Sequence, residues 1–165
     1  TADSALRKGL HPDDLRRQFE TQVEWQGSRT ASKVGLAADG RAQSPGETVS
    51  RVAFMELGLP APDLQGRLDN PDGSVFAYLD FVWWDLRTAA EFDGKRKYYR
   101  DLRDGEDPGD IVWREKVRED RIREEFGFEV FRIVWDDLMP WRRAALGRRA
   151  LAAFSRGTSL RRRSA

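Results

Sequence analysis

Cysteine is absent from the 165 residues, and histidine occurs once, as His11. The lack of cysteine excludes a disulfide scaffold and a thiolate zinc site, and it fits a reducing, cytoplasmic location. A single histidine argues against a histidine-based metal site and against a Ser–His hydrolase. Catalytic chemistry must then come from carboxylates, amines, guanidinium groups, hydroxyls or the backbone. Carboxylates favour hard, oxygen-binding ions, so any metal is expected to be Mg²⁺ or Mn²⁺.

Long apolar runs are also missing. No segment approaches the ~20 apolar residues that a membrane-spanning helix needs, and no secretory signal is visible, so we expect no membrane partner. The chain starts at Thr1, without a methionine, inside a pattern typical of a helix. We therefore interpret the sequence as a piece of a longer protein.

Charge is unevenly distributed along the chain. The formal net charge is +1, but the segment from Trp141 to Ala165 holds eight arginines and no acid. Those eight belong to 29 basic residues, so the remainder carries 21 basic residues against 28 acidic ones. A basic terminal segment on an acidic body can bind phosphates. The alternative is a solvated helix face that ends in a disordered basic tail, which we place at residues 157–165.

The first part of the chain, residues 1–43, is expected to form a helical connector. Leucines and aromatic residues recur at near-helical spacing from Ala2 to Gly35. Residues 9–11 interrupt this pattern, and Pro12 suits the first turn of a second helix, which places His11 at a helix entrance. Residues 37–46 are rich in small residues and proline and indicate a connection.

The second part, residues 44–156, mixes helical and strand-like periodicities that turn residues separate. The expected elements are a helix at Glu47–Leu57, extended segments at Pro62–Gln65, Val75–Trp83, Thr88–Phe92 and Phe128–Val134, a helix at Ile111–Phe126, and a last helix that follows Asp136 or Asp137 and contains Trp141. The early strands are expected to pair antiparallel through hairpins. The fold class is therefore α/β or α+β, with helices on the faces of a sheet.

Two sets of apolar side chains are expected at packing positions. The inner face of the Ile111–Phe126 helix is assigned to Val112, Lys116 or Val117, Ile122 and Phe126. Four tryptophans are expected to pack in the sheet or between helices and sheet. They are Trp83, Trp113, Trp135 and Trp141.

Two acids stand where strands are expected to be buried. Asp80 lies between apolar neighbours, and Glu91 lies in the next strand, after two alanines. Burying an unpaired carboxylate is costly, and like charges on neighbouring strands repel each other. A divalent cation bound by both carboxylates removes both penalties, which predicts that the two side chains face one cleft. The alternative is that one acid pairs with Arg118, Arg121 or a helix N-terminus.

The sequence around these acids resembles the PD-(D/E)XK nucleases. Ten residues separate Asp80 from the motif Glu91-Phe-Asp-Gly94. Five further segments are similar to the group that contains the very-short-patch mismatch-repair endonucleases. These segments are Ser44–Arg51, Gly58–Pro60, Lys97-Tyr98, Glu115–Asp120 and Phe131–Trp135. The resemblance spans Ser44 to about Leu138. It implies a restriction-endonuclease-like core, in which helices flank a mixed four-stranded sheet, with an N-terminal helical extension.

The resemblance also implies roles for single residues. Asp80 and Glu91 would bind Mg²⁺ or Mn²⁺ beside the backbone carbonyl of Phe92. Glu47 would add a ligand, unless this acid only stabilises a helix N-terminus. Asp93 stands where the family's name-giving lysine is expected, and it could be a further metal ligand.

The cation that the motif lysine would supply must then come from elsewhere. Lys95 or Lys97 could reach the site because both follow Asp93 closely, and Lys116 could contact the scissile phosphate. If no lysine reaches the site, the domain could bind metal or DNA and yet cut poorly.

The function that the resemblance implies is that of a metal-dependent endonuclease, which hydrolyses phosphodiester bonds in DNA. The alternative is a catalytically weak or inactive nuclease-fold module for DNA binding or protein interaction, and a weaker alternative is an RNA-directed nuclease. Similar domains often follow a winged helix in proteins that resemble type IV toxin–antitoxin antitoxins. The expected partner is therefore DNA, with a partner protein or a homodimer left open.

Overall fold

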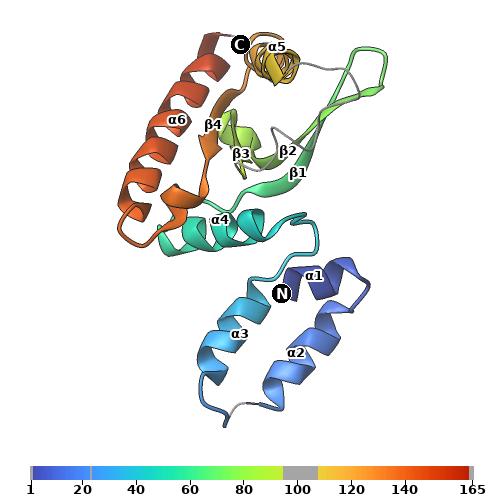
Figure 1. The fold of residues 1–165 in the computed structure, drawn as a ribbon, viewed down its shortest axis with the longest axis vertical. Coiled ribbons are helices and arrows are strands. Elements are labelled where there is room, and N and C mark those ends of the chain that lie inside the picture. Colours follow the sequence, from blue (N-terminus) through green and yellow to red (C-terminus); the bar gives the residue numbers. More distant parts are fainter. Residues whose placement is uncertain (1, 23, 95–107, 164–165) are drawn as a thin grey trace. The chain divides into compact units, whose positions relative to one another are not determined.

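The chain divides into two units, which are described one by one (Figure 1). The computed structural model describes residues 2–22, 24–94 and 108–163. Unit 1 comprises Thr1–Thr48 and unit 2 comprises Val49–Ala165. The boundary falls inside helix α4 (Pro45–Glu56), shortly after the boundary expected between residues 43 and 44.

Unit 1 is helical. It contains α1 (Ala2–Arg7), α2 (Pro12–Glu20) and α3 (Ser28–Leu36), followed by the start of α4. The predicted break before the second helix is confirmed. His11 caps α2, because its Nδ1 accepts a hydrogen bond of 3.3 Å from the backbone N–H of Asp13.

A four-stranded sheet in the order β1-β2-β3-β4 forms the centre of unit 2. Strands β1 (Asp63–Asp69), β2 (Val75–Trp83) and β3 (Thr88–Phe92) pair antiparallel, and β4 (Glu129–Ile133) pairs parallel with β3. A parallel neighbour requires a crossover, and α5 (Pro108–Glu124) lies between these two strands in the sequence. The last helix, α6 (Arg143–Arg163), follows β4. The predicted fold class, a mixed four-stranded sheet with flanking helices and an N-terminal helical part, is confirmed.

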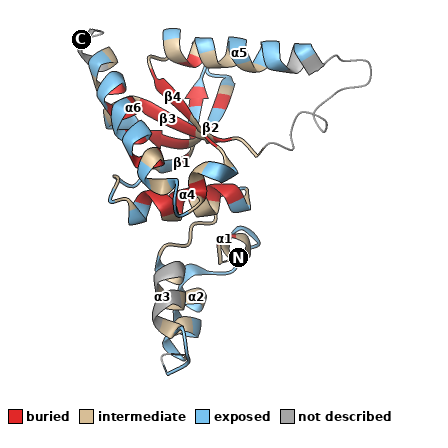
Figure 2. Cartoon of the chain, turned by 60° about the vertical axis from the view of Figure 1, so that its left-hand side comes forward, coloured by how far each residue is buried: buried red, intermediate tan, exposed pale blue. Residues whose placement is uncertain are grey.

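Helices cover both faces of the sheet in unit 2 (Figure 2). On one face, Phe54 of α4 and Phe154 of α6 pack edge-on against Trp83, with ring centroids 5.2 and 4.9 Å apart. On the other face, Phe76 of β2 stacks on Phe126, which follows α5, at 5.1 Å. Because successive strand residues point to opposite faces, Asp80 shares the α5 face with Phe76.

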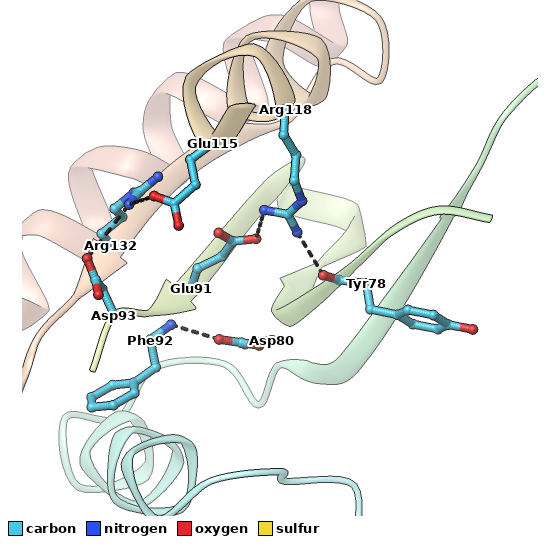
Figure 3. Close-up of a pocket in the computed structure, with 8 residues that line it drawn as sticks. All are labelled: Tyr78, Asp80, Glu91, Phe92, Asp93, Glu115, Arg118 and Arg132. Carbon is cyan, nitrogen blue, oxygen red and sulfur yellow. Dashed lines mark hydrogen bonds and ion pairs between the residues drawn. The ribbon is translucent and has the colours of Figure 1, made fainter. Parts of the chain in front are cut away.

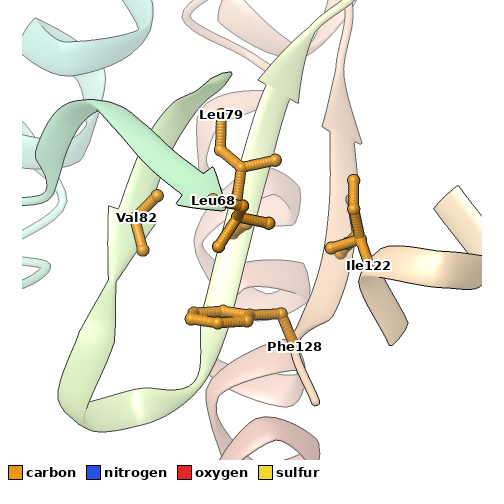
Figure 4. Close-up of a cluster of buried hydrophobic side chains, with 7 residues drawn as sticks. Leu68, Leu79, Val82, Ile122 and Phe128 are labelled. Atoms are coloured by element: carbon orange, nitrogen blue, oxygen red, sulfur yellow. The ribbon is translucent and has the colours of Figure 1, made fainter. Parts of the chain in front are cut away.

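A buried apolar cluster joins the sheet to α5 (Figure 4). Its members are Leu68, Leu79, Val82, Ala89, Ile122, Phe128 and Val130. The predicted inner face of α5 is confirmed for Ile122, which is fully buried, and for Phe126, which packs on the cluster. It is wrong for Val112 and Val117, which are 53% and 40% exposed. Val112 and Val117 lie in the N-terminal part of α5. The side of this part that faces the sheet carries charged residues, because this part of the helix covers the polar pocket described below.

The predicted strand bounds are confirmed for β2 and β3. Strand β1 is longer than the predicted Pro62–Gln65 and runs on to Asp69. Gln65 has a φ of +53°, and a Cβ on Gly66 would lie 2.4 Å from a methyl group of Val82. These two residues interrupt the alternating pattern, although the strand continues through them.

The prediction of buried tryptophans is confirmed for Trp83, which is 4% exposed. It is wrong for Trp113 and Trp141, which are 65% and 75% exposed. Trp135 is 45% exposed, and its ring packs edge-on against Phe92 of β3 with the ring centroids 5.1 Å apart. Trp141 also lies outside the last helix, which begins at Arg143 and not near Asp137. Pro140 explains this difference, because proline disfavours helical backbone in the residue before it and lacks an N–H.

None of the helices in the described ranges is both long and apolar enough to cross a membrane. Helix α6 carries arginines to its end at Arg163. Residues 157–163 of the predicted basic tail therefore continue this helix.

Candidate active site

A pocket of about 290 Å³ lies between the sheet and α5 in unit 2 (Figure 3). Strands β2, β3 and β4 and helix α5 all contribute to its lining. The lining residues are Tyr78, Asp80, Glu91, Phe92, Asp93, Glu115, Arg118 and Arg132. Four acids and two arginines therefore meet in one cavity. The resemblance predicts this place for Asp80, Glu91 and Asp93 but not for Glu115.

Asp80 and Glu91 lie on the same face of the sheet. Phe81 of β2 pairs with Ala90 of β3, and one further step of this antiparallel register sets Asp80 opposite Glu91. Directly opposite residues of an antiparallel pair point to the same face. Both acids line the pocket, so the prediction that they face one cleft is confirmed.

A backbone hydrogen bond holds the Asp80 carboxylate in place. Its Oδ2 accepts a hydrogen bond of 2.8 Å from the backbone N–H of Phe92 (Figure 3). The acid is half-buried, so this bond offsets part of its desolvation. The bond also fixes one carboxylate beside the peptide that follows Glu91.

The Glu91 carboxylate forms an ion pair with Arg118 of α5. Arg118 Nη1 lies 2.8 Å from Glu91 Oε1, and its Nη2 donates a hydrogen bond of 3.0 Å to the Tyr78 carbonyl oxygen. The alternative in which one acid pairs with Arg118 is therefore realised for Glu91. Arg121 instead pairs with Glu125 at 2.8 Å.

Asp93 belongs to a second charged network around Arg132 of β4. Arg132 Nη1 lies 3.7 Å from Asp93 Oδ2 and 3.3 Å from Glu115 Oε2, and Nη2 lies 3.1 Å from Glu119 Oε2. Burial would lower the pKa of the Arg132 guanidinium, but the hydrogen bond to Glu115 and the attraction of Glu119 outweigh it, so the pKa is raised above its ordinary value. The guanidinium therefore stays charged and holds three acids together.

Replacing Arg132 by methionine is expected to destabilise unit 2. The change leaves three carboxylates close together without their shared cation, at a cost of about 1–2 kcal/mol after allowance for partial exposure. Urea unfolding would measure the loss. Arg67→Met is the control, because Arg67 pairs with Asp69 on the edge strand β1, both side chains are exposed, and its loss should change the stability little. Equal stability of the Arg132→Met and wild-type proteins would contradict this role.

Glu47 belongs to unit 1 and lies in the first turn of α4. Its backbone N–H donates to Ser44 Oγ at 3.2 Å, and its Oε2 accepts a hydrogen bond of 2.8 Å from the backbone N–H of Gln43. Ser44 is thus the N-cap of α4, and the Glu47 carboxylate binds the backbone N–H of the residue before that cap. The alternative role at a helix N-terminus is therefore present, and metal ligation by Glu47 stays a prediction.

Of the three predicted lysines, the structure describes Lys116. Lys95 and Lys97 lie outside the described residues. Lys116 is exposed on α5 and is not among the lining residues, because Glu115 and Arg118 occupy the side of α5 that faces the sheet. The cations that the structure brings to the acids are arginines.

The resemblance implies Mg²⁺ or Mn²⁺ at these acids. Among the described residues, no cluster of three or more His, Cys, Asp or Glu side chains is arranged to hold a metal. Mg²⁺ commonly keeps several waters and binds proteins through one or two carboxylates. Asp80 and Glu91, which both line the pocket, fit this mode of binding.

Sequence reasoning missed Arg132 and Glu115 as members of the site. An available signal was the position of Arg132 within the apolar run Phe131-Arg-Ile-Val134, since an arginine inside a strand needs acidic partners. Tyr78 was also missed, and it is 51% exposed at the edge of the pocket. Its position two residues before Asp80 on one strand places both on the same face.

Comparison with known proteins gives relatives without an assigned activity. The chain is 32% identical over 142 residues to an uncharacterized protein of Mycobacterium tuberculosis, strain CDC 1551, and equally to one of strain H37Rv. The matched region is 84% of this chain and 48% of each relative, so the chain spans about half the length of the curated relatives it matches. No family model and no solved structure matches the chain.

Proposed function

We propose that this chain carries a metal-dependent endonuclease domain that hydrolyses phosphodiester bonds in DNA. The observation that supports the proposal most is the placement of Asp80 and Glu91 on paired strands, facing one pocket, with the Phe92 backbone between them. The same αβββαβ order and mixed sheet are what the resemblance to PD-(D/E)XK nucleases implies. The proposed reaction requires DNA as partner and fits a cytoplasmic location.

The chain's own residues would bind and orient the reacting groups. Asp80 and Glu91 would hold Mg²⁺ or Mn²⁺, with the Phe92 carbonyl and Asp93 as candidates for further coordination. When bound, such an ion supplies a water of lowered pKa and offsets charge on the phosphate. In the hydrolysis, a water oxygen bonds to phosphorus, the bond to one sugar oxygen breaks, and that oxygen takes up a proton.

The charge of the pocket is consistent with a need for added cations. Its lining contains four acids, Asp80, Glu91, Asp93 and Glu115, and two arginines. An excess of negative charge repels a phosphodiester. The formal charge of these six side chains is −2, and a divalent ion on Asp80 and Glu91 would neutralise it, so DNA binding in the pocket should depend on the metal.

Glu91→Gln is the first test of this function. The variant should lose nicking of supercoiled plasmid in Mg²⁺ or Mn²⁺ by about a hundredfold or more, because a neutral amide is a poor ligand for a hard cation. Glu125→Gln is the matched control, since Glu125 lies beyond the end of α5, away from the pocket, in a pair with Arg121. Equal nicking by the Glu91→Gln and wild-type proteins would rule out the assignment.

A second candidate is a nuclease-fold module that binds DNA or a protein without cutting, as in an antitoxin-like regulator. The ion pairs Glu91–Arg118 and Asp93–Arg132 favour it, because arginines occupy acids that a metal would need. Asp93 favours this second candidate as well, because it stands where the nuclease family has its lysine. This candidate predicts DNA or protein binding that is the same with Mg²⁺ and with a chelator, and no nicking under either condition.

A further inference from the structure

Arg118 places a guanidinium directly on one of the proposed metal ligands. One nitrogen lies 2.8 Å from Glu91, and another donates to the Tyr78 carbonyl at 3.0 Å (Figure 3). The side chain thereby bridges β3 and β2 across the pocket. The Arg118 side chain is 35% exposed, against 20% for Glu91, so the arginine is the more accessible member of the pair.

We propose that Arg118 supplies the positive charge that the motif lysine would otherwise supply. While no divalent ion is bound, Arg118 neutralises Glu91. When Glu91 binds the ion, Arg118 leaves the carboxylate and contacts the scissile phosphate. This inference rests on the proposed nuclease function and adds a residue, with a metal-dependent change of partner, to the same site.

Electrostatics favour this exchange. A guanidinium and a divalent cation at one carboxylate repel each other, so the two compete for Glu91. A phosphodiester offers two oxygens to the planar guanidinium fork, in the same bidentate geometry as a carboxylate. The bond from Nη2 to the Tyr78 carbonyl does not involve Glu91, so it can persist while Nη1 turns to the new partner.

The other described cations are less well placed for this role. Arg132 is held by Asp93, Glu115 and Glu119 together, which leaves it little capacity for a phosphate. Lys116 is exposed and does not line the pocket. Among the described residues, Glu91 is the carboxylate that pairs with Arg118, and metal binding would take that partner away.

Titration of the complete chain with Mn²⁺, followed by electron paramagnetic resonance of the free ion, tests the competition without reference to activity. Arg118→Met should bind Mn²⁺ about tenfold more tightly than wild type, because a competing unit charge is removed. Arg118→Lys should stay near wild type. Arg121→Met is the matched control, since Arg121 lies one turn further along α5 and pairs with Glu125.

Binding of a labelled DNA duplex in Ca²⁺, and plasmid nicking in Mn²⁺, test the second half of the inference. Arg118→Met should lose DNA affinity and nicking by about tenfold or more despite its tighter metal binding, and Arg118→Lys should restore part of both. Circular dichroism of each variant checks that it is folded. The combination of tighter metal binding with weaker DNA binding is specific to a residue that changes partners.

The outcomes separate this inference from the function on which it rests. If the wild-type protein binds Mn²⁺ and nicks DNA, and Arg118→Met matches Arg121→Met in all three measurements, the role of Arg118 is overturned and the nuclease proposal stands. If Arg118→Met binds Mn²⁺ more weakly than the wild-type protein, Arg118 does not compete with the ion for Glu91, and the inference is overturned while the nuclease proposal stands. If the wild-type protein neither binds Mn²⁺ nor nicks DNA, the nuclease proposal fails and the inference fails with it.

Discussion

The Asp80→Asn protein is expected to nick supercoiled plasmid about a thousandfold more slowly than the wild-type protein in Mg²⁺. The substitution removes one of the two carboxylates that line the pocket from paired strands. It keeps a side-chain oxygen that can accept the 2.8 Å hydrogen bond from the Phe92 N–H. The fold should therefore survive, and thermal unfolding followed by circular dichroism should be close to that of wild type.

Asp69→Asn is the control for this prediction. Asp69 ends the neighbouring strand β1, is exposed, and pairs with Arg67 at 2.6 Å, away from the pocket. Its neutralisation should leave nicking unchanged. An Asp80→Asn protein that is folded and nicks as fast as the Asp69→Asn protein would show that Asp80 is not a metal ligand for the reaction.

Gly157→Ala is expected to cause the largest loss of stability from a single methyl group. Gly157 of α6 lies against the start of β3, where a Cβ would meet the carbonyl oxygens of Leu86 and Arg87 at 2.3 and 2.6 Å and the Thr88 hydroxyl at 2.4 Å. Backbone oxygens cannot move aside as a flexible side chain can, so the helix would be displaced. We expect the free energy of unfolding to fall by about 3 kcal/mol, as measured by urea titration.

Gly147→Ala in the same helix is the matched comparison. A Cβ there would meet only the side chain of Leu57, at 3.2 Å from one methyl group, and that side chain can rotate. Alanine also favours helix over glycine by about 0.8–1.0 kcal/mol, so the variant should be as stable as wild type or slightly more stable. A Gly157→Ala protein as stable as the Gly147→Ala protein would contradict the close approach of α6 to β3.

The strands that carry the proposed site were predictable from local pattern. Val75–Trp83 and Thr88–Phe92 are rich in aromatic and small apolar residues, and turns bound them, so the predicted and observed ends coincide. The pairing of Asp80 with Glu91 followed, because a short hairpin sets the register between neighbouring strands. The parallel addition of β4 agrees with the mixed sheet that the family resemblance implied.

The partners of the site acids were not predictable from the sequence. Residues of α5 and β4 reach the pocket only through the tertiary arrangement, and spacing along the chain does not show which arginine meets which acid. Arg118 was one of several alternatives for an acid's partner, and Arg132 was not predicted to be a site residue. The wrong burial predictions for Val112, Val117 and Trp113 have the same cause. Their apolar character suggested burial, but the part of α5 that carries them covers a polar pocket.

Plasmid nicking by the wild-type protein, with Mg²⁺ and with a chelator in its place, tests the central claim most directly. The assay compares the wild-type protein with Asp80→Asn, prepared in parallel to control for contaminating nucleases. The account predicts nicking only by the wild-type protein and only with the metal present. Equal nicking by both proteins, or nicking in the chelator, would contradict it.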